Sequence, residues 1–62
     1  MDKRNPVILI VEDEPEVLSI NARMMKRRGY DVITAQSFKE SMEKLSEYTP
    51  DLLILDIMLP DG

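Results

Sequence analysis

Apolar residues form two short unbroken runs, one near each end of the chain, and the segments between them alternate apolar and polar residues. Residues 7–11 (VILIV) and residues 52–55 (LLIL) are apolar throughout. Such runs are typical of parallel strands that are covered on both faces. The sequence therefore predicts two fully buried strands. Residues 30–35 are mixed in polarity and predict a third strand nearer an edge of the sheet.

Two amphipathic helices are predicted between these strands. In residues 14–28 the apolar side chains gather on one side of a helical wheel. Asp13 is the expected N-cap of this helix, and Gly29 is expected just after its last turn. Residues 37–40 (SFKE) have the pattern of a capping box and predict the start of the second helix, which Pro50 ends.

Alternating strands and helices predict an α/β fold with parallel strands joined by right-handed crossovers. With two buried strands and one peripheral strand, the simplest sheet has the strand order 2-1-3. The chain reverses its direction of progress about the first strand, so the two helices are expected on opposite faces of the sheet.

Composition and charge narrow the functional classes. The chain has 62 residues, no cysteine, and eight basic against twelve acidic residues, for a net charge of −4. This balance disfavours a nucleic-acid surface in the segment. The apolar runs are too short for a membrane span or a signal peptide. Together with the absence of cysteine, this predicts a cytoplasmic protein without membrane contact.

Acidic residues follow both apolar runs, with Glu12, Asp13 and Glu14 after the first run and Asp56 after the second. Because the carboxyl ends of parallel strands lie at the same edge of a sheet, we expect Glu12, Asp13 and Asp56 to converge in the crevice between the two buried strands. Carboxylates about 5 Å apart repel by about 3 kcal/mol at an effective dielectric of about 20, which favours a cation among them. Oxygen ligands without histidine or cysteine indicate Mg²⁺, with Mn²⁺ as a substitute, and Asp56 is then a candidate nucleophile toward phosphorus.

Simpler interpretations exist for each acid alone. Glu12, Asp13 and Glu14 are also favourable near a helix N-terminus, and Asp56 also fits an Asx turn after a strand. Their joint position after two adjacent strands favours the functional interpretation. A P-loop is excluded because Gly29 and Gly62 are the only glycines. The Asp-x-Asp motif of haloacid-dehalogenase phosphatases is also missing.

Residues 8–14 (ILIVEDE) and 51–62 (DLLILDIMLPDG) resemble the amino-terminal half of a bacterial response-regulator receiver domain, the phosphoacceptor module of two-component signalling. The resemblance implies the β-α-β-α-β half of a doubly wound, flavodoxin-like sheet. Residues 1–62 are accordingly expected to be one truncated receiver domain with no second domain. It also implies a regulator rather than an enzyme.

The resemblance assigns roles to individual residues. It implies that Asp56 accepts a phosphoryl group from a sensor histidine kinase or a phosphotransfer protein. It further implies that Glu12, Asp13 and Asp56 bind Mg²⁺, and that the backbone carbonyl of Met58 is another ligand. The family's hydroxyl residue after the fourth strand and its lysine after the fifth are not among these residues, so we expect the fragment to be impaired in phosphorylation.

The third strand has a further expected consequence. In a truncated domain it is an apolar edge, so we expect the chain to self-associate through this strand. An alternative function is therefore a non-catalytic interaction or self-assembly module in which the acidic site is vestigial.

Overall fold

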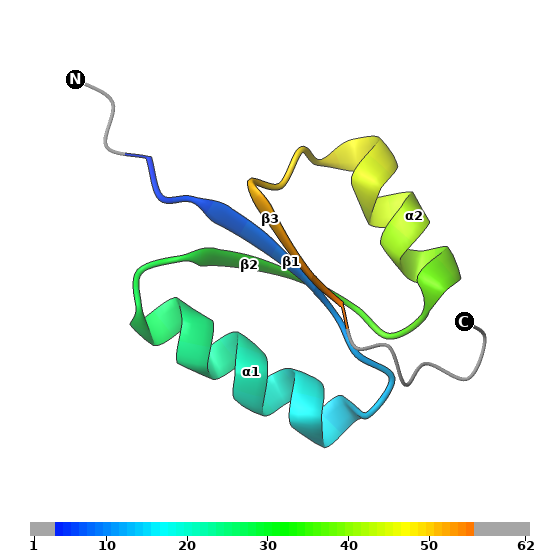
Figure 1. The fold of residues 1–62 in the computed structure, drawn as a ribbon, viewed down its shortest axis with the longest axis horizontal. Helices are drawn as coiled ribbons and strands as arrows, with labels where there is room; N and C mark the ends of the chain where they lie inside the picture. Colours follow the sequence, from blue (N-terminus) through cyan, green and yellow to red (C-terminus); the bar gives the residue numbers. More distant parts are fainter. Residues whose placement is uncertain (1–3, 56–62) are drawn as a thin grey trace.

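A three-stranded parallel sheet with one helix on each face makes up the described part of the chain (Figure 1). The computed structural model describes residues 4–55. Along the chain the elements are β1 (Val7–Val11), α1 (Pro15–Arg27), β2 (Asp31–Ala35), α2 (Phe38–Glu47) and β3 (Leu52–Leu55). Both β2 and β3 pair in parallel with β1, which gives the order β2-β1-β3. The predicted fold class, strand order and helix placement are confirmed.

The central strand β1 carries the core. Its residues Ile8–Val11 are each at most 1% exposed. Alternate side chains of β1 point to opposite faces of the sheet. On one face they pack with Ala35 of β2, and on the other they pack with Leu18 of α1 and with Ile54 of β3. The residues at 4–55 therefore form two small apolar clusters that share one strand.

The end of α1 directs the chain into β2. Gly29 adopts a positive φ of 95°, a conformation that glycine tolerates best. The Gly29 N–H donates to the Lys26 carbonyl at 3.0 Å, and the Tyr30 N–H donates to the Met25 carbonyl at 3.2 Å. This pair of hydrogen bonds is the Schellman arrangement that ends many helices. The predicted glycine after the last turn is confirmed.

The start of α2 is fixed by side chains, as the capping-box pattern predicts. The Ser37 Oγ accepts a hydrogen bond from the Glu40 N–H at 3.0 Å, and Glu40 Oε1 accepts one from the Gln36 N–H at 2.9 Å. The glutamate therefore reaches the residue before the cap. Among residues 4–55, neither helix has the length and apolar character needed to cross a membrane.

The burial predicted for the second apolar run is wrong. Leu52, Leu53 and Leu55 of β3 are 53%, 47% and 46% exposed. The reason is the position of the strand in the sheet. Both helices lie closer to β1 and β2 than to β3, and within the described part of the chain only β1 has close backbone contacts with β3.

Candidate functional site

A buried acid follows the central strand. Glu12 is only 3% exposed. Its backbone N–H donates to the Ala35 carbonyl at 3.0 Å, which extends the pairing with β2 by one residue. Its side-chain Oε2 accepts a hydrogen bond from the Glu14 N–H at 3.1 Å. Because buried carboxylates need partners that offset their lost hydration, this contact helps to hold the Glu12 side chain at the carboxyl end of β1.

Asp13 is partly exposed and lies outside α1. Its predicted role as N-cap is wrong, because the cap residue is Glu14, whose backbone is extended and whose side chain makes no capping hydrogen bond. The cause is Pro15 at the first helical position, since a residue before proline is held in an extended conformation. Asp13 is therefore not needed to start the helix.

The interpretation as ordinary acids at a helix N-terminus holds for Glu14, which is the cap residue, and loses support for Glu12 and Asp13. The acidic residue in the first turn of α1 is Glu16. Glu12 and Asp13 lie in the connection between β1 and α1, at the carboxyl end of the sheet. The structure thus brings two carboxylates on successive residues to the edge where open α/β sheets bind ligands.

The strand β3 ends beside the same edge. Leu55 pairs in register with Val11, the residue that precedes Glu12. Asp56 follows Leu55 directly in the sequence. Asp56 and Met58 lie outside the described residues, so the convergence of all three carboxylates stays a prediction. Within residues 4–55 there is no group of three or more histidine, cysteine or acidic side chains that could hold a metal ion.

The donor set nevertheless fits the predicted cation. Glu12 and Asp13 offer only carboxylate oxygens, and the whole chain contains no histidine or cysteine. Mg²⁺ is usually bound by one or two carboxylates and keeps several of its waters. One buried and one partly exposed carboxylate at the mouth of a sheet match this requirement.

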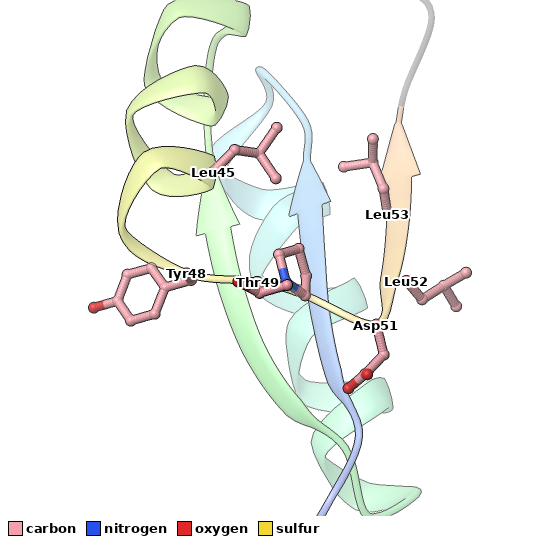
Figure 2. A pocket seen from close by; sticks show the side chains of 7 residues that line it. Leu45, Tyr48, Thr49, Asp51, Leu52 and Leu53 are labelled. Carbon is pink, nitrogen blue, oxygen red and sulfur yellow. The ribbon is translucent and has the colours of Figure 1, made fainter.

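A pocket at the opposite end of the sheet involves different residues. It has a volume of about 370 Å³ and lies between the end of α2 and the start of β3 (Figure 2). Its lining residues are Leu45, Tyr48, Thr49, Pro50, Asp51, Leu52 and Leu53. Because β1 and β3 are parallel, the start of β3 is far along the sheet from the acids that follow β1. The pocket is therefore separate from the acidic site.

Sequence reasoning missed one interaction in this region. The sequence pattern assigned no partner to Asp51, yet its Oδ2 accepts a hydrogen bond from the Val7 N–H at 2.8 Å. The available signal was an aspartate directly before an apolar strand. That signal does not name the partner, which lies 44 residues away in the sequence.

The comparison with known families decides the assignment. The family model described as the response regulator receiver domain matches residues 8–62. The chain belongs to this family. The resemblance seen in the sequence is thereby confirmed, and the receiver domain is a signalling module of two-component systems. Receiver domains are regulators rather than classical enzymes, generally bind Mg²⁺ at an acidic site, and interact with histidine kinases or phosphotransfer proteins.

Several curated regulators are similar to this receiver chain. The alkaline phosphatase synthesis transcriptional regulatory protein PhoP of Bacillus subtilis is 43% identical over 56 residues, which cover 90% of this chain and 23% of the relative. The transcriptional regulatory protein KdpE of Mycobacterium tuberculosis is 38% identical over 55 residues, covering 89% and 24%. The phosphate regulon transcriptional regulatory protein PhoB of Escherichia coli is 34% identical over 55 residues, again covering 89% and 24%. The chain spans about a quarter of the length of these relatives.

Proposed function

We propose that the chain is a phosphoacceptor module in which Asp56 takes a phosphoryl group from a sensor histidine kinase or a phosphotransfer protein. The observation that carries the proposal is the pair Glu12 and Asp13 at the carboxyl end of the buried central strand. The strand that leads to Asp56 lies directly beside them, with Leu55 and Val11 in register. Membership of the receiver family supports the same role.

The proposed chemistry is a transfer between two side chains. A carboxylate oxygen of Asp56 attacks the phosphorus of a phosphohistidine, so that an oxygen–phosphorus bond forms. The phosphorus–nitrogen bond breaks, and the imidazole that leaves takes up a proton. Glu12, Asp13, Asp56 and the Met58 carbonyl would hold Mg²⁺, which when bound supplies positive charge near the phosphoryl oxygens.

The residues of the β1–α1 connection have distinct parts in this proposal. The Glu12 side chain is held by the Glu14 N–H, so its carboxylate is oriented before any ligand arrives. Asp13 does not cap α1, so its carboxylate is available to a cation. We infer that Glu12 mainly orients the ligand shell and that Asp13 is a direct ligand.

A mass measurement tests the proposal. The chain is incubated with acetyl phosphate or beryllofluoride in the presence of Mg²⁺, and the intact mass is recorded. We expect an adduct that disappears in Asp56→Asn and when EDTA removes the metal. Asp13→Ala is expected to weaken both Mg²⁺ binding and adduct formation. Asp31→Ala, which removes an exposed acid at the start of β2, is the matched control and is expected to leave both unchanged.

Two results would contradict the assignment. An adduct that persists in Asp56→Asn would place the phosphoacceptor elsewhere. Unchanged Mg²⁺ binding in Asp13→Ala would remove this residue from the metal site. The impaired phosphorylation expected for residues 1–62 stays a prediction. The cytoplasmic location also stays a prediction.

A second function is favoured by the exposure of β3. Three of its four side chains are about half exposed, and the strand contains no charged residue or proline. Within the described chain, the edge of β3 that faces away from β1 pairs with no other strand. Uncharged apolar edges of this kind readily pair with another chain. We propose that the chain also self-associates through β3, and this stays the main role if the acidic site is vestigial.

Light scattering at increasing concentration tests this second function. We expect the mean mass to rise with concentration and to return to that of a monomer in Leu53→Lys, because lysine on an edge strand opposes pairing. Ile20→Lys is the matched control, since Ile20 lies on α1 and is 59% exposed. A chain that is monomeric at every concentration would contradict self-association. Equal effects of both lysines would contradict the assignment to β3.

A further inference from the structure

We propose that Asp51 is a positioning residue that sets the register of β3 on β1, and through it the distance from Glu12 to the residue after Leu55. The inference rests on the proposed function, because that residue is the proposed phosphoacceptor. Asp51 lies directly before β3, at the opposite end of the sheet from Glu12 and Asp13. The inference therefore links two regions that are connected through the strands β1 and β3.

Two hydrogen bonds join Asp51 to the first residue of β1. The Asp51 N–H donates to the Val7 carbonyl at 2.7 Å, and Asp51 Oδ2 accepts from the Val7 N–H at 2.8 Å. The side chain of Asp51 points toward the start of β1 (Figure 2). Both backbone polar groups of Val7 are thus satisfied by one residue that directly precedes β3.

The side chains of β3 do not specify its register well. A strand with alternating apolar and polar residues resists a one-residue shift, because the shift would turn its polar residues toward the core. The sequence LLIL of β3 has no such alternation. Its three leucines are exposed to similar extents on the two faces of the sheet. A shifted register would therefore leave a similar amount of apolar surface covered.

The packing around β3 also leaves the register open. Ile54 is the residue of β3 that packs against the core cluster of Ile8 and Ile10. After a shift of one residue a leucine would take its place, and exchanges between isoleucine and leucine are usually well tolerated. In the described chain, both helices lie closer to β1 and β2 than to β3, so they constrain the register of β3 only weakly. The polar contact at Asp51 is therefore the feature that distinguishes the observed register from its neighbours.

A shift of register would matter for phosphoryl transfer. Moving a strand by one residue displaces every residue along it by about 3.3 Å. Misplacing a reacting group by about 1 Å can already reduce a rate by about 100-fold. Val11 and Leu55 form the last described pair of the ladder, so a shift of β3 would also displace the proposed phosphoacceptor, which follows Leu55 in the sequence.

The opposite side of β1 provides a matched control. Asp31 is an exposed aspartate that begins β2 and pairs in register with Val7. Its N–H donates to the Pro6 carbonyl at 2.9 Å, which is a backbone contact that any residue except proline would make. Residues 31–35 (DVITA) are mixed in polarity, so β2 has another source of register. Replacing Asp31 removes the same charge from the same end of the sheet.

The experiment compares Asp51→Ala, Asp51→Asn and Asp31→Ala in the full chain. Cross-strand contacts between Ile8 and Leu52 and the exchange rate of the Val7 amide are measured by NMR, and the beryllofluoride adduct with Mg²⁺ is measured by mass. In Asp51→Ala we expect contacts of a shifted register and an adduct reduced about two- to tenfold, the range that corresponds to one lost hydrogen bond. Asp51→Asn is expected to stay close to the unaltered chain, because its amide oxygen still accepts from the Val7 N–H. Asp31→Ala is expected to change neither measurement.

The outcomes separate this inference from the proposed function. An unchanged register in Asp51→Ala would overturn the inference, whatever happens to the adduct. A similar loss in Asp51→Asn would also overturn it, because charge rather than the hydrogen bond would then be responsible. No adduct in the unaltered chain would refute the proposed function, while the NMR comparison would still decide the role of Asp51. If Asp51→Ala does not fold, Asp51→Glu replaces it, and an adduct equal to that of Asp51→Asn would overturn the inference.

Discussion

The strands β1 and β3 are similar in composition and opposite in burial. Both are unbroken aliphatic runs, yet Ile8–Val11 of β1 are at most 1% exposed, and the leucines of β3 are about half exposed. The difference comes from their neighbours. β1 lies between two strands and beneath two helices, whereas β3 has close backbone contacts with β1 alone within the described chain. An unbroken apolar run thus shows that a strand is suited to burial, and the rest of the fold decides whether it is covered.

The same contrast extends to the proposed site. Glu12 and Asp13 follow a strand that is fixed from both sides and on both faces. Asp56 follows a strand that is held on one side only. Functional groups are placed most accurately by elements that are well packed. We therefore infer that the metal ligands after β1 are positioned more firmly than the proposed phosphoacceptor after β3.

The largest expected effect comes from the pair Leu9 and Leu53, which are partners in the register of β1 and β3. Leu9 is 0% exposed and Leu53 is 47% exposed. We expect Leu9→Ala to lower the free energy of unfolding by about 2–5 kcal/mol, because it leaves a cavity in the core. Leu53→Ala is expected to cost about 1 kcal/mol, since half of its side chain is already in water. Urea unfolding followed by circular dichroism measures both.

The two outcomes of this comparison are distinct. A loss for Leu53→Ala as large as that for Leu9→Ala would show that β3 is covered in solution. Self-association through β3 is one way to cover it, so both variants are measured at two protein concentrations. If the loss of unfolding free energy in Leu53→Ala grows with protein concentration, then a second copy of the chain packs over β3.

Most of the fold followed from the sequence because it depends on local periodicity. The two apolar runs, the mixed run at 30–35, the helical spacing within 14–28 and the capping box at 37–40 were enough to predict the elements and the strand order. Burial of the run at residues 52–55 was predicted wrongly, since it depends on which elements pack over it. The contact of Asp51 with Val7 was missed, because no local pattern names a partner so distant in the sequence.

The candidate site was predictable to a smaller extent. Glu12 and Asp13 lie at the carboxyl end of β1, as the order of elements required. The capping role of Asp13 was predicted wrongly, because the general preference for aspartate at a cap competes with the extended conformation imposed before Pro15. The positions of Asp56 and Met58 stay predictions, since they lie outside the described residues.

A smaller effect is expected at Gly29, which ends α1 above β1 and β2. Its φ of 95° costs other residues about 1 kcal/mol or more, although an added Cβ would meet no atom within 4 Å. We expect Gly29→Ala to destabilise the chain by about 1 kcal/mol, and Gly29→Asn to cost less, because asparagine adopts this conformation more readily. Hydrogen exchange is expected to increase more in β2 than in β3, since α1 lies closer to β2 than to β3. Equal costs for alanine and asparagine would contradict a conformational cause.

The smallest effect concerns Ser37, which caps α2 on the other face of the sheet. Ser37→Ala removes the acceptor for the Glu40 N–H and is expected to cost about 1 kcal/mol or slightly less. Ser46→Ala is the matched control, because the Ser46 hydroxyl donates to the Glu43 carbonyl inside the helix and alanine has a high helix propensity. We expect the control to change the free energy of unfolding by a few tenths of a kcal/mol at most. Since α2 packs over β1 and β2, loosening its first turn should speed amide exchange in those strands and leave β3 unchanged. If Ser37→Ala increases amide exchange more in β3 than in β1, then α2 also protects the edge strand. The difference in burial between β1 and β3 would then need a cause other than the placement of α2.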